Sequence, residues 1–137
     1  MATANITNLD ALKCVAGQFD FAKLGGAVGD YLLGVKIPAG AVIVNAFCTV
    51  LTAGDSADDT ATIAVKVESA NDIISAAAVS GAPWSTTGQK QGVPDWATVA
   101  DYKTTTAERD ITVSIAVQAL TAGKFNVYVF YVHNATA

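Results

Sequence analysis

The stretch Ile111-Thr-Val-Ser-Ile-Ala-Val117 decides the fold class, because Ile or Val occupies every second position and smaller or polar residues lie between. This period of two sends one set of side chains into a core and the other toward solvent or a partner, as in a half-buried antiparallel strand. Residues 31–37 and 60–68 repeat the pattern. We therefore predict an all-β chain that folds as a single antiparallel β-sandwich, jelly-roll-like in its architecture.

The alternation also indicates a domain boundary near residue 31. Residues 1–30 lack a clear period and contain several glycines, so we expect an N-terminal arm there, with at most a short strand near residues 12–16. Residues 31–137 are expected to form the sandwich. Its further strands are predicted at 42–51, 71–79, 98–105, 111–120 and 125–133.

The predicted strand 42–51 is apolar on both faces. Val44 and Cys48 lie on one face in simple alternation, and Ile43 and Phe47 lie on the other. A strand of this kind is either central in the sandwich or has a second face that meets a partner.

Two segments of equal length, 42–54 and 111–123, both end in Leu-Thr-Ala-Gly. They are either a duplicated hairpin or two strands that end in the same favourable turn, and the second interpretation is favoured because their other matches are only of hydrophobic class. We expect Gly123 to occupy the left-handed position of a bulged hairpin turn at 121–123.

The composition limits the kinds of partner. Only 15% of the residues are charged, against about 25% in a typical soluble domain, so we expect another subunit to cover part of the surface. The net charge of −4 and the scattered basic residues argue against nucleic acid as a partner. No apolar run approaches the ~20 residues that a membrane span needs, and the first residues carry no secretion signal, so we expect synthesis in a host cytoplasm and no membrane partner.

The sequence contains no constellation that predicts catalysis, a cofactor or a metal site. His133 is the only histidine, and no nucleophile or elbow motif accompanies it. The acidic turn at 55–59 lacks the ligand spacing of a calcium loop, and Cys14 and Cys48 lack zinc spacing. We interpret both cysteines as small buried thiols; the alternative is a Cys14–Cys48 disulfide, which no feature of the sequence indicates. We predict that the protein is not an enzyme.

The two tryptophans lie in the irregular segment 80–110. Trp84 and Trp96 either close the open end of the sandwich, anchor a protein interface, or form a platform for sugar rings. The predicted interface set consists of Trp84, Trp96, Phe47 and Tyr102.

Four segments carry a resemblance to a known class of proteins: Ile37-Pro-Ala-Gly40, Lys103-Thr-Thr-Thr-Ala-Glu-Arg109, Leu120-Thr-Ala-Gly-Lys-Phe125, and residues 127–132. Over roughly residues 31–133 the chain resembles the small auxiliary proteins that decorate or cement the capsids of tailed bacteriophages. The resemblance implies a β-rich structural protein on the capsid exterior of the virion, trimeric around local three-fold axes. It implies the major capsid protein and a second copy of the chain as partners. The alternative is a carbohydrate-binding sandwich that uses Trp84 and Trp96 in host attachment.

Overall fold

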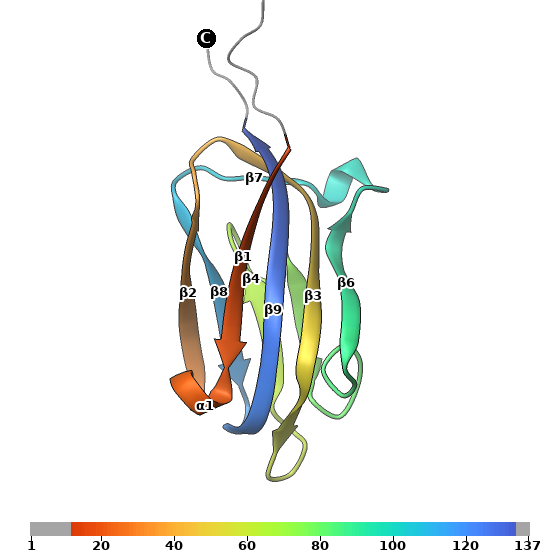
Figure 1. The fold of residues 1–137 in the computed structure, drawn as a ribbon. Coiled ribbons are helices and arrows are strands. Elements are labelled where there is room, and N and C mark those ends of the chain that lie inside the picture. The colour runs from red at the N-terminus through yellow and green to blue at the C-terminus, as the bar shows by residue number, and fades with distance from the viewer. Residues whose placement is uncertain (1–11, 134–137) are drawn as a thin grey trace, which may run out of the picture.

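The computed structural model describes residues 12–133, which form two antiparallel sheets packed face to face (Figure 1). Among these residues no helix is long and apolar enough to cross a membrane. The elements in chain order are β1 (Lys13–Asp20), α1 (Phe21–Leu24), β2 (Gly29–Ile37), β3 (Ala41–Ser56), β4 (Thr62–Lys66), β5 (Ile74–Ala78), β6 (Gly88–Asp95), the 3₁₀ turn η1 (Val99–Asp101), β7 (Lys103–Thr104), β8 (Arg109–Ala116) and β9 (Leu120–His133).

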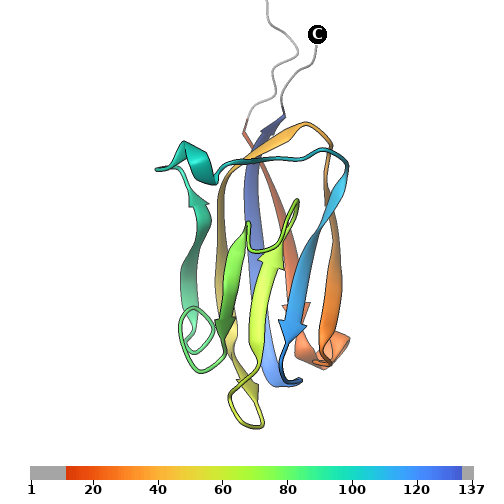
Figure 2. The same ribbon diagram turned by 180° about the vertical axis from the view of Figure 1, so that it is seen from behind.

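The strand order is that of a jelly roll. The first sheet has the order β1-β9-β3-β6, with β7 also pairing with β3, and the second has the order β2-β8-β4-β5. The pairs β1–β9, β2–β8, β3–β6 and β4–β5 therefore alternate between the sheets (Figures 1 and 2). One long hairpin rolled up on itself produces this order. The predicted all-β sandwich is confirmed, with the jelly-roll connectivity.

The core lies between the sheets, where alternate strand residues meet. In β9 the side chains of Phe125, Val127 and Val129 are buried, and the residues between them are partly exposed. Trp84 completes this core: its ring is 1% exposed and its centroid lies 4.7 Å from that of Phe125. The indole Nε1 donates a hydrogen bond of 3.0 Å to the carbonyl oxygen of Ile63, which satisfies its polar group.

The burial of Trp84 decides among the three interpretations of this residue. Its ring closes the core, so the assignment of Trp84 to an exposed interface, or to a sugar platform, is wrong in this fold. Its burial depends on the segment 79–85 folding back over the end of the sandwich, where Val79 N donates to Ala61 O and Gly54 N donates to Trp84 O. Local sequence carries no signal for this long-range packing.

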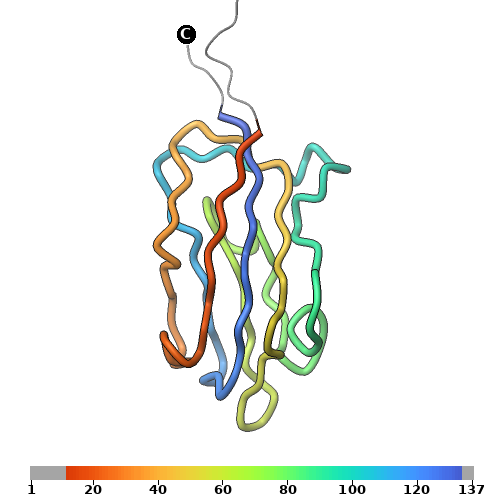
Figure 3. The backbone as a smooth tube through the Cα atoms, viewed as in Figure 1, coloured from red at the N-terminus to blue at the C-terminus, as the bar shows by residue number. Residues whose placement is uncertain are grey.

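The sandwich begins earlier in the chain than residue 31. Residues 13–20 form β1, which pairs with β9 along its whole length (Figure 3), and its Phe19 is fully buried. Gly17 permits the close approach of β2, since a Cβ atom there would lie 2.9 Å from Leu33 Cβ. The predicted arm therefore differs from the structure over residues 13–30, and residues 1–11 lie outside the described residues.

A bulge in β3 overturns the simple two-face description of residues 42–51. The register with β9 shifts between Ile43 and Asn45. As a result Ile43, Ala46 and Cys48 all face the core, and Phe47 faces outward. An extra residue in one strand changes the phase of every side chain beyond it.

The predicted turn at 121–123 is wrong. The chain reverses at Val117–Ala119, and residues 120–123 already belong to β9. Residues 51–54 likewise lie inside β3, so both Leu-Thr-Ala-Gly segments belong to neighbouring strands where the β3–β9 register is irregular, and Gly123 lies close to Gly54. Gly123 has a φ of +151° at an irregular part of this ladder. The position therefore favours glycine, as expected, but it lies in a strand and not in a turn.

The irregular segment 80–110 contains a strand that the period-two rule missed. β6 has the sequence Gly-Gln-Lys-Gln-Gly-Val-Pro-Asp and no alternation, because it is an edge strand with a bulge. At Gly92 an added Cβ would lie 2.6 Å from Ala46 O and 2.7 Å from Ile73 O. The strand predicted at 98–105 is replaced by η1 and the two-residue β7, and the strand predicted at 71–79 is confirmed as the shorter β5.

We expect Trp84→Ala to lower the free energy of unfolding by about 3–5 kcal/mol, because it leaves a cavity against Phe125 and removes the hydrogen bond from the indole to Ile63 O. Urea denaturation followed by circular dichroism measures the loss. Val99→Ala is the control, since Val99 is 74% exposed and its truncation should change stability by less than about 0.5 kcal/mol. Equal effects of the two substitutions would contradict the role of Trp84 in the core.

Candidate interaction surface

Aromatic side chains gather on the outer face of the first sheet. Because Val127, Val129 and Tyr131 point into the core, Tyr128 and Phe130 point outward from β9. Phe47 of β3 lies opposite Tyr128 in the β3–β9 register. The ring centroids of Phe47 and Tyr128 are 4.7 Å apart and those of Phe47 and Phe130 are 6.0 Å apart, both in stacked geometry. We call Phe47, Trp96, Tyr128 and Phe130 the aromatic face.

Trp96 extends this face from the loop after β6. Its ring centroid lies 6.4 Å from that of Phe130, and the residue is 50% exposed. Its φ is +73°, in the left-handed region that few residues other than glycine, Asn or Asp adopt without cost. Trp96 N donates to Val44 O at 3.2 Å, and Tyr102 Oη donates to Trp96 O at 3.3 Å. The loop therefore holds a large apolar ring at the surface in a strained backbone conformation, which points to a use outside the fold.

The surroundings of the aromatic face are small or amide-bearing. Cys14 and Ala16 of β1 lie opposite Phe130 and Tyr128. Gln18 Nε2 donates to Asn126 Oδ1 at 2.8 Å, and Gln91 Nε2 donates to Asn45 Oδ1 at 2.8 Å. An apolar centre within a polar rim is the usual anatomy of a protein interface.

The outer face of the second sheet has a different chemistry. Lys66 forms an ion pair of 3.1 Å with Asp30, and Lys36 forms one of 2.9 Å with Asp110. The pKa of Asp30 is lowered, first by a hydrogen bond from Ser114 and then by Lys66, and the pKa of Lys36 is raised by Asp110. These charges are already paired and solvated, so this face has little to gain from burial.

A third ion pair ties the loop before β8 to the end of β4. Arg109 Nε donates to Glu68 Oε1 at 2.9 Å, and Thr106 Oγ1 donates to Glu68 Oε2 at 2.9 Å. The pKa of Glu68 is lowered, first by Arg109 and then by Thr106. This cluster holds a surface loop in place, and it contains no residue of the aromatic face.

The two cysteines differ from each other. Cys14 is exposed beside the aromatic face, so its interpretation as a buried thiol is wrong, whereas Cys48 is buried as predicted. Burial raises the pKa of Cys48 to about 11, and a smaller degree of burial raises the pKa of Cys14. Both thiols are free.

His133 and Asp72, two other residues with ionisable side chains, make hydrogen bonds to backbone groups. Nε2 of His133 lies 2.9 Å from Ala39 O. The buried carboxylate of Asp72 accepts hydrogen bonds from the backbone N–H groups of Val67, Glu68 and Ser69. Within residues 12–133 no group of three or more His, Cys, Asp or Glu side chains could hold a metal ion.

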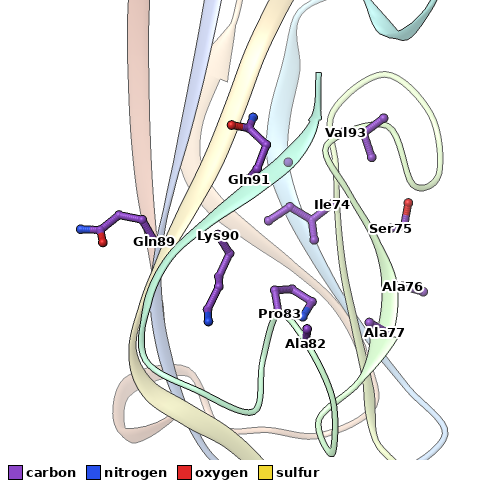
Figure 4. A pocket seen from close by; sticks show the side chains of 11 residues that line it. Ile74, Ser75, Ala76, Ala77, Ala82, Pro83, Gln89, Lys90, Gln91 and Val93 are labelled. Atoms are coloured by element: carbon purple, nitrogen blue, oxygen red, sulfur yellow. The ribbon is translucent and has the colours of Figure 1, made fainter. Parts of the chain in front are cut away.

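A cleft of about 580 Å³ opens between the edge strands β5 and β6 (Figure 4). Its one ionisable lining side chain is Lys90, whose Nζ donates to Thr86 Oγ1 at 2.6 Å. The cleft is lined by Ile74, Ser75, Ala76, Ala77, Ala82, Pro83, Gln89, Lys90, Gln91, Gly92 and Val93. It therefore presents mainly small side chains, whereas the aromatic face presents four large rings.

Three of the four residues predicted for an interface come together. Phe47 and Trp96 both contact Phe130, and Tyr102 bonds the backbone of Trp96, whereas Trp84 lies in the core. Their role in binding stays a prediction. Tyr128 and Phe130 were not among the predicted site residues, although the period of two in strand β9 places both rings on its outward face.

Comparison with solved structures finds the same fold in three phage capsids. The structures are the acidic stable capsid of Helicobacter pylori bacteriophage KHP30 (TM-score 0.64, 16% identity, 93% of this chain and 91% of that chain), the capsid asymmetric unit of cyanophage Pam1 (0.66, 20%, 98% and 92%), and the capsid of Ralstonia phage GP4 (0.68, 17%, 99% and 93%). No known protein family and no curated protein matches the sequence.

The chain is thus a jelly-roll sandwich whose whole fold is shared with chains found in phage capsids. The match spans nearly the full length of each chain. At these identities the similarity establishes the fold.

We expect Trp96→Asn to change the free energy of unfolding by less than about 1 kcal/mol, because the ring is half exposed and Asn tolerates a positive φ. Trp96→Val is the matched control: it also removes the ring, but a β-branched residue should cost a further 1–2 kcal/mol or so in the left-handed region. Urea denaturation of both variants measures the difference. Equal stability of the two would show that the backbone at Trp96 relaxes without cost.

Proposed function

We propose that the chain is a non-enzymatic structural protein of a phage virion that decorates the capsid exterior and stabilises the shell. The observation that carries this proposal is the full-length fold shared with chains of three phage capsids. Its partners are the major capsid protein and further copies of itself, in a trimer. Assembly on a shell needs broad complementary surfaces.

The aromatic face is the surface proposed to meet the major capsid protein. Trp, Tyr and Phe are enriched in the buried centres of protein interfaces, where a few such rings supply most of the binding energy. Phe47, Trp96, Tyr128 and Phe130 form one connected group of rings on the outer face of the first sheet. Covering this group stabilises the shell by adding buried apolar area between its subunits.

The alternative of a carbohydrate-binding module loses its specific support. That interpretation used Trp84 and Trp96 as a pair, and Trp84 is buried in the core. Trp96 instead belongs to a group of rings that are tilted or stacked against one another, so protein burial is the use that fits the aromatic face.

We expect Phe130→Ser to weaken attachment to phage particles by roughly 30-fold, since loss of a central interface ring costs about 2 kcal/mol. Co-sedimentation of purified protein with capsids that lack it measures the affinity. Leu32→Ser is the matched control, because Leu32 is 64% exposed on the charged outer face of the second sheet. Its substitution should leave attachment unchanged.

Three other outcomes would reject parts of this proposal. If Phe130→Ser and Leu32→Ser lost affinity for the particles equally, the aromatic face would not be the contact surface. Undiminished binding of Phe130→Ser would lead to the same conclusion, and a failure of the wild-type protein to bind any particle would reject the decoration role. Binding to a glycan array that Trp96→Asn abolishes would restore the carbohydrate alternative.

We expect Cys14 to react with a maleimide in the free protein and to be protected on the particle. Its strand position opposite Phe130 places the thiol beside the proposed contact surface. Cys48 is an internal control, since its buried thiol should stay unmodified in both states until the protein is denatured. Mass spectrometry of labelled peptides reads both sites. Equal labelling of Cys14 in the free and the attached protein would contradict this placement of the interface.

A further inference from the structure

A second exposed apolar group lies at one end of the sandwich. Figure 1 shows α1, the β8–β9 turn and the β3–β4 loop together at the end opposite to the one where β1 begins and β9 ends. Leu24, Val28 and Val117 of this end are 43%, 57% and 73% exposed. Leu120 N donates to Gly26 O at 2.7 Å, which holds the α1–β2 connection against the β8–β9 turn. We call Leu24, Val28 and Val117 the end patch.

Val117 occupies a backbone conformation that does not suit its side chain. Its φ is +72°, and a β-branched residue in the left-handed region is an outlier that glycine, Asn or Asp would relieve. The side chain is largely exposed, so no packing within the chain explains the choice of valine. A strained residue that also exposes an apolar side chain points to a contact outside the chain.

Unlike charges flank the end patch. Lys23 precedes Leu24 at the end of α1. On the other side, Asp58 N donates to Gln118 Oε1 at 2.9 Å and Gln118 Nε2 donates to Asp58 Oδ2 at 3.0 Å, which fixes the acidic β3–β4 loop beside Val117. In the part of the chain that the structure describes, no ion pair uses Lys23, Asp58 or Asp59.

The acidic loop carries like charges close together. The pKa of Asp59 is raised, first by a hydrogen bond with Asp55 and further by the charges of Asp55 and Asp58. A cation brought to this loop would relieve that repulsion. The chain itself presents such a cation at the opposite side of the end patch, on Lys23.

We infer that the end patch is an interface between copies of this chain, with Lys23 of one copy against the Asp58–Asp59 loop of the next and Val117 buried between them. A trimer requires a head-to-tail contact, which closes into a ring when its rotation allows, and opposite charges on the two sides of the patch suit such a contact. The inference rests on the proposed function in one respect, because it takes the trimer from there and names the surface that joins its copies. The aromatic face is not part of this contact and stays free to bind the shell.

The first test is Val117→Asp, examined by sedimentation velocity of the purified protein without particles. The wild type is expected to be a trimer, and the variant a monomer, because the substitution places a charge in the centre of the apolar contact. Asp also suits a positive φ, so the variant chain should remain folded, and circular dichroism checks that it does. Val99→Asp is the matched control: Val99 is 74% exposed and lies outside the end patch, so that variant should stay trimeric.

The second test reverses the charges. Lys23→Asp and Asp58→Lys should each weaken association by about tenfold or more, because like charges then face each other across the contact. The chain that carries both substitutions should regain association, since the charges complement each other again. Rescue by the double variant separates a direct contact from general damage to the fold.

Each outcome bears on the inference. A trimer that survives Val117→Asp, a double variant that fails to regain association, or a wild type that is monomeric at every concentration would overturn it. Val117→Asp monomers that still attach to capsids would support separate surfaces for self-association and for the shell. Loss of particle attachment by the trimeric wild type would count against the proposed function and would leave this inference standing.

Discussion

The antiparallel pairing of β3 with β9 is the constraint on which the rest of the molecule depends. These are the longest strands, with 16 and 14 residues, and β9 also carries β1 on its other side. Their register sends Val127 and Val129 to the core and Tyr128 and Phe130 to the surface. A slip of one residue would exchange the two sets, and the core and the aromatic face would be lost together. Stability and surface chemistry are therefore two results of one alignment.

The two tryptophans have opposite roles in this fold. Trp84 has its ring in the core and its indole nitrogen bonded to Ile63. Trp96 keeps half of its area exposed on a strained backbone that Tyr102 and Val44 hold in place. A buried ring is explained by folding alone. The exposed ring lowers the stability that the loop could reach, so its explanation has to be sought in binding.

Much of the fold could be predicted from the sequence, and the failures have identifiable causes. The alternation in β2, β4 and β8 marked half-buried strands correctly. Bulges defeated the same rule: in β3 the register shift before Asn45 changes the phase, and in β6 Gly92 and the edge position leave no alternation at all. Trp84 could not be placed because its neighbours come from distant segments. Tyr128 and Phe130, by contrast, were readable as outward rings and were overlooked because residues 127–132 are apolar throughout.

The pairing of β1 with β9 has a consequence for how the protein is made. Gln18 and its cross-strand neighbour Asn126 are separated by 108 positions in the chain, and among the strands of residues 12–133 β1 pairs with β9 alone. During synthesis β1 therefore leaves the ribosome long before its partner exists. Closing so long a loop is entropically costly and makes folding slow, so the sandwich cannot be completed until translation has passed β9. A nascent chain stalled short of that strand would present β1 and the incomplete core to chaperones or to aggregation.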